Sequence, residues 1–189
     1  MYTTAFSMQE DTMVENGLYV VKRDILEIIS SLGGDCDINY GNKRPVFCCL
    51  KDNKVDGLYW AIPTSDIAHR EDKQKTFYPF CLSRPDSDLR SCYYHIAKTT
   101  KDALYKISSC YPITEKYVDH EFISNNKHVI MRKQQDIVEI RRKMRRILSM
   151  ESKRPNYFPQ HITELKNYLI DELHQNVLNE VAVTLEQEN

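Results

Sequence analysis

The stretch GLYWAIPTSDIAHREDK, residues 57–73, carries the strongest local structural signal in the chain. Residues 58–62 are all apolar and lie between Gly57 and Pro63, which predicts a short buried strand. Residues 64–66 (Thr-Ser-Asp) are all preferred helix N-cap types, and a charged stretch follows them. The sequence therefore predicts a strand that changes into a helix at this point.

On such a helix Ser65, His69 and Lys73 share one face, because each lies four residues from the next. A helix N-terminus offers free N–H groups and the positive end of the helix dipole, and both favour a bound anion such as a phosphate. Our hypothesis from these residues is that the junction holds the scissile phosphate of an RNA.

The rest of the chain alternates strand patterns with helix patterns, and its last third is helical. This order favours an α+β protein built on a small antiparallel barrel or a strongly curved sheet. The predicted strands are residues 17–21, 45–51, 58–62, 91–98 and 103–110, with an irregular segment at 111–117, and the predicted helices are residues 23–32, 130–150 and 162–177.

Composition limits the classes of function. The chain has 189 residues, 41% hydrophobic and 28% charged, which suits one globular domain over residues 16–189 behind a flexible leader at 1–15. We expect the barrel at about residues 17–117 and the helical part at about 125–180. Five glycines form no dinucleotide or P-loop fingerprint, and six cysteines show no zinc spacing, so we expect no cofactor and no metal. We find no signal peptide and no membrane span, and expect a cytoplasmic protein.

The net charge of −1 hides a strongly basic segment. Residues 127–154 carry ten Lys or Arg against three Asp or Glu, whereas residues 1–40 carry two against seven. Such a segment indicates contact with a polyanion, although the outer face of an amphipathic helix is commonly basic for solubility alone. The predicted RNA contacts are Lys127, Arg132, Arg141, Arg142, Arg145 and Arg146.

The order of several short motifs resembles one family over roughly residues 17–175. The motifs are GLYVV, Tyr40 followed by Lys43-Arg44, PVFCCLK, YWAIPTSDIAHR, Tyr93-Tyr94-His95 and PITEKY. In this order they resemble the type III toxin–antitoxin endoribonucleases of the ToxN/AbiQ superfamily, and most closely its CptN-like branch.

This resemblance implies an SH3-like barrel decorated with helices, similar to the MazF/Kid-type toxins. It implies metal-independent cleavage of cellular or phage RNA that leaves a 2′,3′-cyclic phosphate. The implied partner is a pseudoknot-like repeat RNA antitoxin, which the toxin processes and which holds it in a closed protein–RNA assembly.

The resemblance also implies the site residues. Tyr40 with Lys43 or Arg44 matches the family's loop before the second strand, and Thr64 with Ser65 matches its pair at the end of the third strand. Some members carry a lysine two residues after that serine, where this chain has Ile67. His69 is the nearest basic alternative that physical reasoning offers.

Cleavage through the RNA 2′-hydroxyl needs a base, donors or cations for the phosphate oxygens, and an acid for the leaving group. We assign the oxygens to the Thr64 and Ser65 hydroxyls, charge neutralisation to Lys43 or Arg44, and proton transfer to His69. Tyr40 would orient the 2′-hydroxyl or stack on a base.

Each residue also has a structural interpretation: a helix cap, a solvated strand edge, a turn tyrosine or a surface histidine. His95, which lies mid-strand, is better explained as structural. The alternative functions are a non-catalytic RNA-binding module on the same scaffold and a ribosome-dependent or DNA-directed toxin.

Overall fold

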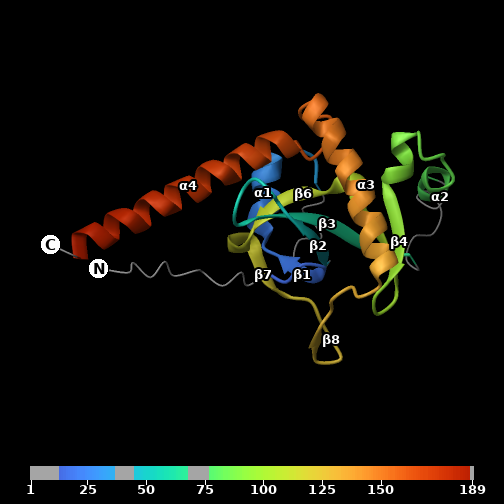
Figure 1. Ribbon diagram of the computed structural model, residues 1–189, viewed down its shortest axis with the longest axis horizontal. Coiled ribbons are helices and arrows are strands. Elements are labelled where there is room, and N and C mark those ends of the chain that lie inside the picture. Colours follow the sequence, from blue (N-terminus) through green and yellow to red (C-terminus); the bar gives the residue numbers. More distant parts are fainter. Residues whose placement is uncertain (1–12, 37–44, 68–76, 188–189) are drawn as a thin grey trace, which may run out of the picture.

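The computed structural model describes residues 13–36, 45–67 and 77–187, which form an α+β protein (Figure 1). A mostly antiparallel sheet lies at the centre, and three helices pack around it. Seven strands form this sheet in the described part, and two more form a separate hairpin. The strands are β1 (Gly17–Val21), β2 (Val46–Lys51), β3 (Leu58–Asp66), β4 (Tyr94–Lys98), β5 (Asp102–Lys106), β6 (Tyr111–Thr114), β7 (Val118–Glu121), β8 (Ile123–Ser124) and β9 (Lys127–His128).

Four α-helices accompany the strands in the described part. The predictions at residues 23–32, 130–150 and 162–177 are confirmed, and the short helix after residue 76 is not among the predicted helices. The helices are α1 (Arg23–Ser31), α2 (Phe77–Leu82), α3 (Gln134–Lys153) and α4 (Ile162–Gln187). No helix among the described residues is long and apolar enough to cross a membrane.

Strand β3 organises the sheet. The order is β4-β5-β3-β2-β1-β7, and β6 also pairs with β3. β2 pairs with one edge of β3, with Phe47 opposite Ile62. On the other edge β6 pairs with Leu58 to Ala61 and β5 pairs with Thr64 to Asp66. The end strands β4 and β7 do not pair with each other in the described residues, so the sheet there is open and not a closed barrel.

The predicted change from strand to helix at residues 64–66 is wrong. β3 continues through Pro63 to Asp66, because β5 supplies a second antiparallel partner at Thr64, Ser65 and Asp66. Ser65 therefore lies in a strand, and it cannot share a helical face with His69 and Lys73. His69 and Lys73 lie outside the described residues.

The predicted strands at 91–98 and 103–110 are shorter than expected. Each is flanked by a 3₁₀ turn, at Leu89–Cys92 and Ile107–Ser109, and the segment after the second turn is strand β6. About five strands were predicted, and the sequence gives little sign of the short polar strands β7, β8 and β9.

Both faces of β1, β2 and β3 are buried, which explains their continuous apolar runs. Alternate residues such as Phe47 and Trp60 pack beneath α3, where Ile140 and Met144 are fully buried. The residues between them pack on the other face against α1 and Leu165 of α4. The second half of α4 extends away from this body in Figure 1.

Candidate functional site

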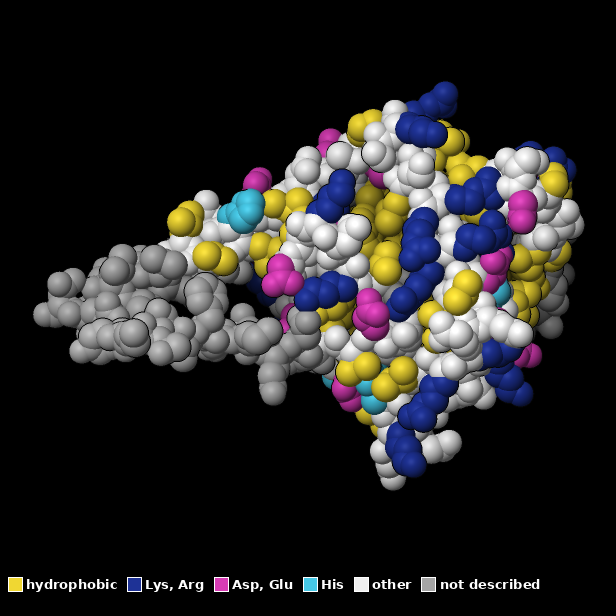
Figure 2. Space-filling view, in the orientation of Figure 1, with side chains coloured by type: hydrophobic (Ala, Val, Ile, Leu, Met, Phe, Trp, Pro, Cys, Tyr) yellow, Lys and Arg dark blue, Asp and Glu magenta, His cyan; other side chains and the backbone are white. Residues whose placement is uncertain are grey.

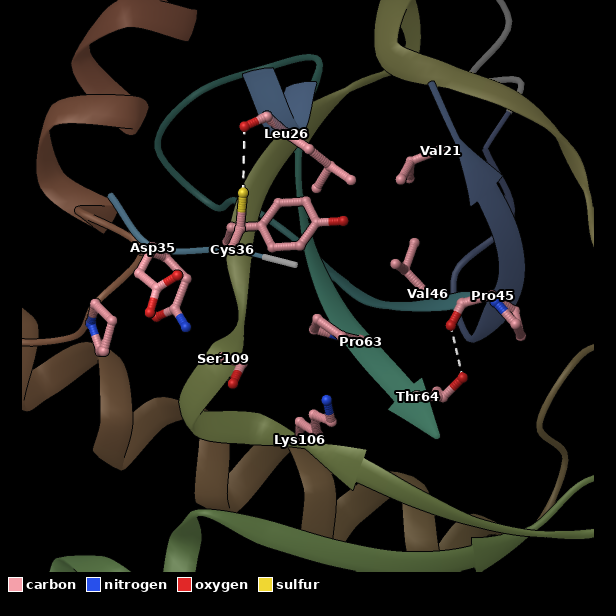
Figure 3. Close-up of a pocket in the computed structure, with 13 residues that line it drawn as sticks. Val21, Leu26, Asp35, Cys36, Pro45, Val46, Pro63, Thr64, Lys106 and Ser109 are labelled. Carbon is pink, nitrogen blue, oxygen red and sulfur yellow. Dashed lines mark hydrogen bonds between the residues drawn. The ribbon is translucent and has the colours of Figure 1, made fainter. Parts of the chain in front are cut away.

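A cleft of about 530 Å³ opens beside β3 at the point where that strand changes partner (Figure 3). Ala61 faces Tyr111 of β6 and Thr64 faces Tyr105 of β5, so the chain between β5 and β6 diverges from β3 there. The described residues that line the cleft are Val21, Leu26, Asp35, Cys36, Pro45, Val46, Pro63, Thr64, Lys106, Ser109, Tyr111, Pro159 and Gln160.

Thr64 is the predicted site residue that the structure places in this cleft. Its side-chain hydroxyl donates to the carbonyl oxygen of Pro45 at 2.6 Å, and its backbone N–H donates to the same oxygen at 3.2 Å (Figure 3). The residue is buried, with 4% of its surface exposed. Its hydroxyl proton is therefore committed to Pro45, and Thr64 fixes the point at which strand β2 begins.

Ser65 follows Thr64 on β3 but is not among the residues that line the cleft. Successive side chains of a strand point to opposite faces, and Ser65 pairs with Leu104 while Thr64 pairs with Tyr105. The predicted Thr-Ser pair is thus divided between two faces of the sheet.

The other predicted catalytic residues, Tyr40, Lys43, Arg44 and His69, lie outside the described residues. The residues that flank the segment 37–44 are described, and Cys36 and Pro45 both line the cleft. Figure 3 shows Cys36 on the side of Asp35, and Pro45 beside Thr64 across the cleft.

Lys106, Ser109 and Asp35 are polar residues of the cleft that the sequence analysis missed. Lys106 ends β5, and in Figure 3 its ammonium group extends toward Pro63. Lys106 is the single cation among the described residues that line the cleft, and Asp35 is the single carboxylate. The sequence did hint at Lys106, because it is a lysine within the largely apolar run ALYKISSC. The sequence did not show which side of that segment would line a cleft.

Tyr111 closes the floor of the cleft as a neutral phenol. Burial holds the pKa of its hydroxyl far above the usual range, so it does not act as a base near neutral pH. No histidine lines the cleft in the part of the chain that the structure describes. Within that same part, no group of three or more His, Cys, Asp or Glu side chains is arranged to hold a metal ion.

Three of the predicted RNA-binding arginines bind other parts of the protein. Arg141 donates to the Glu15 carboxylate at 2.9 Å, near the end of the predicted leader. Arg142 lies 2.8 Å from the Glu139 carboxylate and 3.3 Å from that of Asp86, and the bond to Glu139 raises the pKa of its guanidinium.

Arg146 donates to the backbone oxygen of Asp86, so Arg142 and Arg146 together hold the loop after α2 against α3. Lys127, Arg132 and Arg145 are exposed and form no ion pair with another described residue. In Figure 2 Lys and Arg side chains gather over α3 and again on the β8–β9 hairpin.

His95 is a largely buried histidine whose carboxylate partner lies on another element. Its Nε2 lies 3.2 Å from Asp136 Oδ1, which joins strand β4 to helix α3. Burial outweighs this contact and lowers the pKa of the imidazole below its usual value of 6.5. His95 does not line the cleft.

No known protein-family model matches this chain, and no curated protein sequence is significantly similar to it. The resemblance to the ToxN/AbiQ superfamily therefore stays a prediction, based on the order and spacing of the motifs.

Proposed function

We propose that this protein is a metal-independent endoribonuclease toxin of a type III toxin–antitoxin system. In this proposal it cleaves RNA through the 2′-hydroxyl and leaves a 2′,3′-cyclic phosphate. A structured RNA that the enzyme itself processes binds and inhibits it in a closed, cytoplasmic protein–RNA assembly. The SH3-like, MazF/Kid-type relationship belongs to the same proposal, and the two partners that β3 takes along one edge support it.

One observation supports the site above all. The described residues on either side of the segment with Tyr40, Lys43 and Arg44 line the same cleft as the end of the third strand. These flanking residues are Cys36 and Pro45, and the third strand reaches the cleft through Thr64.

The described residues suggest how the roles are divided. Lys106 supplies a positive charge to the phosphate as negative charge develops on its oxygens, and it joins Lys43 or Arg44 in this role. Thr64 positions the second strand through Pro45 instead of binding phosphate with its proton. His69 keeps the role proposed from the sequence, whereas Ser65 does not line the cleft and has no part in phosphate binding in this proposal.

The test is cleavage of a mixed-sequence RNA by the purified protein in the presence of EDTA. We expect cleavage to persist and the products to end in 2′,3′-cyclic phosphate. Lys106→Ala should lower the rate about 100-fold, which is typical for loss of one charge-stabilising group. Lys98→Ala, at an exposed lysine of β4, is the matched control and should cleave normally.

Loss of cleavage in EDTA would contradict the metal-independent mechanism. RNA binding without cleavage by the wild-type protein would favour the non-catalytic module. Ser65→Ala should cleave RNA normally, because Ser65 does not line the cleft; a large loss of activity in this variant would move the site away from the cleft.

A further inference from the structure

We propose that the cleft is a nucleobase site in which Gln160 and Asp35 select a base that carries an exocyclic amino group over uracil. The choice of RNA as the ligand rests on the proposed function. The choice of base rests on the polar groups of the cleft.

Gln160 is the first observation. It lines the cleft, only 7% of its surface is exposed, and its side-chain Oε1 is buried with no hydrogen-bond partner among the described residues. A buried acceptor without a donor loses its hydrogen bonds to water and gains none in return, so native proteins rarely retain one. A ligand that donates a hydrogen bond to Oε1 restores the missing bond.

Gln160 is also held in place. It lies in the turn between α3 and α4, where the backbone N–H of Asp35 donates to Pro159 at 2.6 Å. A Cβ on Gly34 would lie 2.9 Å from the backbone oxygen of Gln160, so only glycine allows this close packing. The unpartnered amide is therefore part of a fixed wall.

Asp35 gives the site its direction of hydrogen bonding. Its carboxylate accepts hydrogen bonds and donates none, and it lines the same cleft as Gln160 Oε1. Two acceptors favour an edge rich in donors, such as the amino group of cytosine or adenine. Uracil offers a single N–H between two carbonyl oxygens, and these oxygens would face the acceptors.

The remaining surfaces suit a nucleotide. Val21, Leu26, Val46 and Tyr111 form apolar walls for the faces of a base, and Lys106 supplies a cation for its phosphate. The volume of about 530 Å³ lies within the range of small-ligand sites.

The experiment measures binding of cytidine and uridine 5′-monophosphates, which are of equal size, by NMR titration of the full chain. We expect the wild type to bind the cytidine nucleotide about tenfold more tightly, as one hydrogen-bond mismatch predicts. Asp35→Asn offers an amide donor to the uracil oxygen, so the ratio should fall to about one. Gln160→Leu removes the other acceptor, so it should weaken the cytidine nucleotide more than the uridine nucleotide.

Asp56→Asn makes the same chemical change at a side chain that is 95% exposed, and the ratio should stay at the wild-type value. Thermal melting of each variant shows that it is folded. Equal wild-type affinity for both nucleotides, an unchanged ratio in Asp35→Asn, or no binding of either would overturn the proposal.

A mononucleotide lacks the internucleotide phosphodiester bond that the proposed nuclease cleaves, so its binding does not depend on cleavage. The two proposals can therefore fail separately. Selective binding without RNA cleavage would remove the nuclease and leave the base site. Cleavage without selective binding would do the reverse.

Discussion

Replacing Glu151 tests whether one buried carboxylate holds the turn that forms a wall of the cleft. Glu151 lies near the end of α3 with 4% of its surface exposed. Its Oε1 accepts from the backbone N–H of Asn156 at 2.6 Å, the backbone N–H of Thr163 at 3.2 Å and the Thr163 hydroxyl at 2.6 Å. Its Oε2 accepts from the backbone N–H of Tyr157 at 3.1 Å. The carboxylate thus closes the α3–α4 turn and bonds the first turn of α4.

The hydrogen bonds set the magnitude. In Glu151→Gln the amide oxygen can keep the three bonds of Oε1, while the amide nitrogen meets the N–H of Tyr157 as a second donor. One charge-assisted bond is lost and a buried donor is left unpaired, which costs about 2 kcal/mol. Glu151→Ala removes all four bonds and should cost about 4 kcal/mol at roughly 1 kcal/mol each.

Urea unfolding and thermal melting measure this loss. For a chain of this length, about 2 kcal/mol corresponds to a fall in melting temperature of roughly 4–8 °C. Glu27→Gln is the matched control, because Glu27 forms an exposed pair with Arg23 and its loss should cost little. If Glu151→Gln has the same melting temperature as the control, the turn is held by something other than this carboxylate.

Three further predictions follow from contacts between elements. Thr64→Val should lower the free energy of unfolding by about 1 kcal/mol because it removes the bond that fixes the start of β2, whereas Thr64→Ser should not; equal stability of the two would contradict this role. Arg145→Ala should weaken RNA binding and lower the slope of log affinity against log salt by about one without changing stability. Arg142→Ala should instead lower the free energy of unfolding by about 1 kcal/mol, because it removes partly screened ion pairs with Asp86 and Glu139. Equal stability of the Arg145→Ala and Arg142→Ala variants would contradict this difference in role. Burial lowers the pKa of His95 below 6.5, so its contribution to stability is full above pH 6.5 and falls as pH drops from 6.5 through the folded-state pKa. His95→Gln should flatten unfolding free energy against pH in that window, and an unchanged curve would show that other groups cause it.

Local signals predicted most of the helices and the buried strands. The spacing of Ile137, Ile140, Met144 and Ile147 gives α3, and the apolar runs give β1, β2 and the first half of β3. These signals depend on neighbours within one turn or one strand, so a single sequence contains them.

Contacts between distant residues account for what was missed. Thr64 to Asp66 satisfy the local rules for a helix cap, but pairing with β5 nearly 40 residues later gives their backbone groups partners in a sheet. Likewise Arg141 finds Glu15 at a separation of 126 residues, and no local pattern reveals that partner. Sequence spacing therefore identified the arginine-rich helix but not which arginines are engaged in the fold.

Pro63 shows why the fold places a cleft beside β3. The N–H of Thr64 points toward β2, where it bonds Pro45, so a donor at residue 63 would point to the opposite edge. On that edge the pairing with β6 has ended at Ala61 and the pairing with β5 begins only at Thr64. Any other residue would leave an N–H facing this gap without a strand partner, whereas proline has none to satisfy. The residue that suggested the end of a strand thus lets β3 pass between two partners, and the cleft occupies the space where they separate.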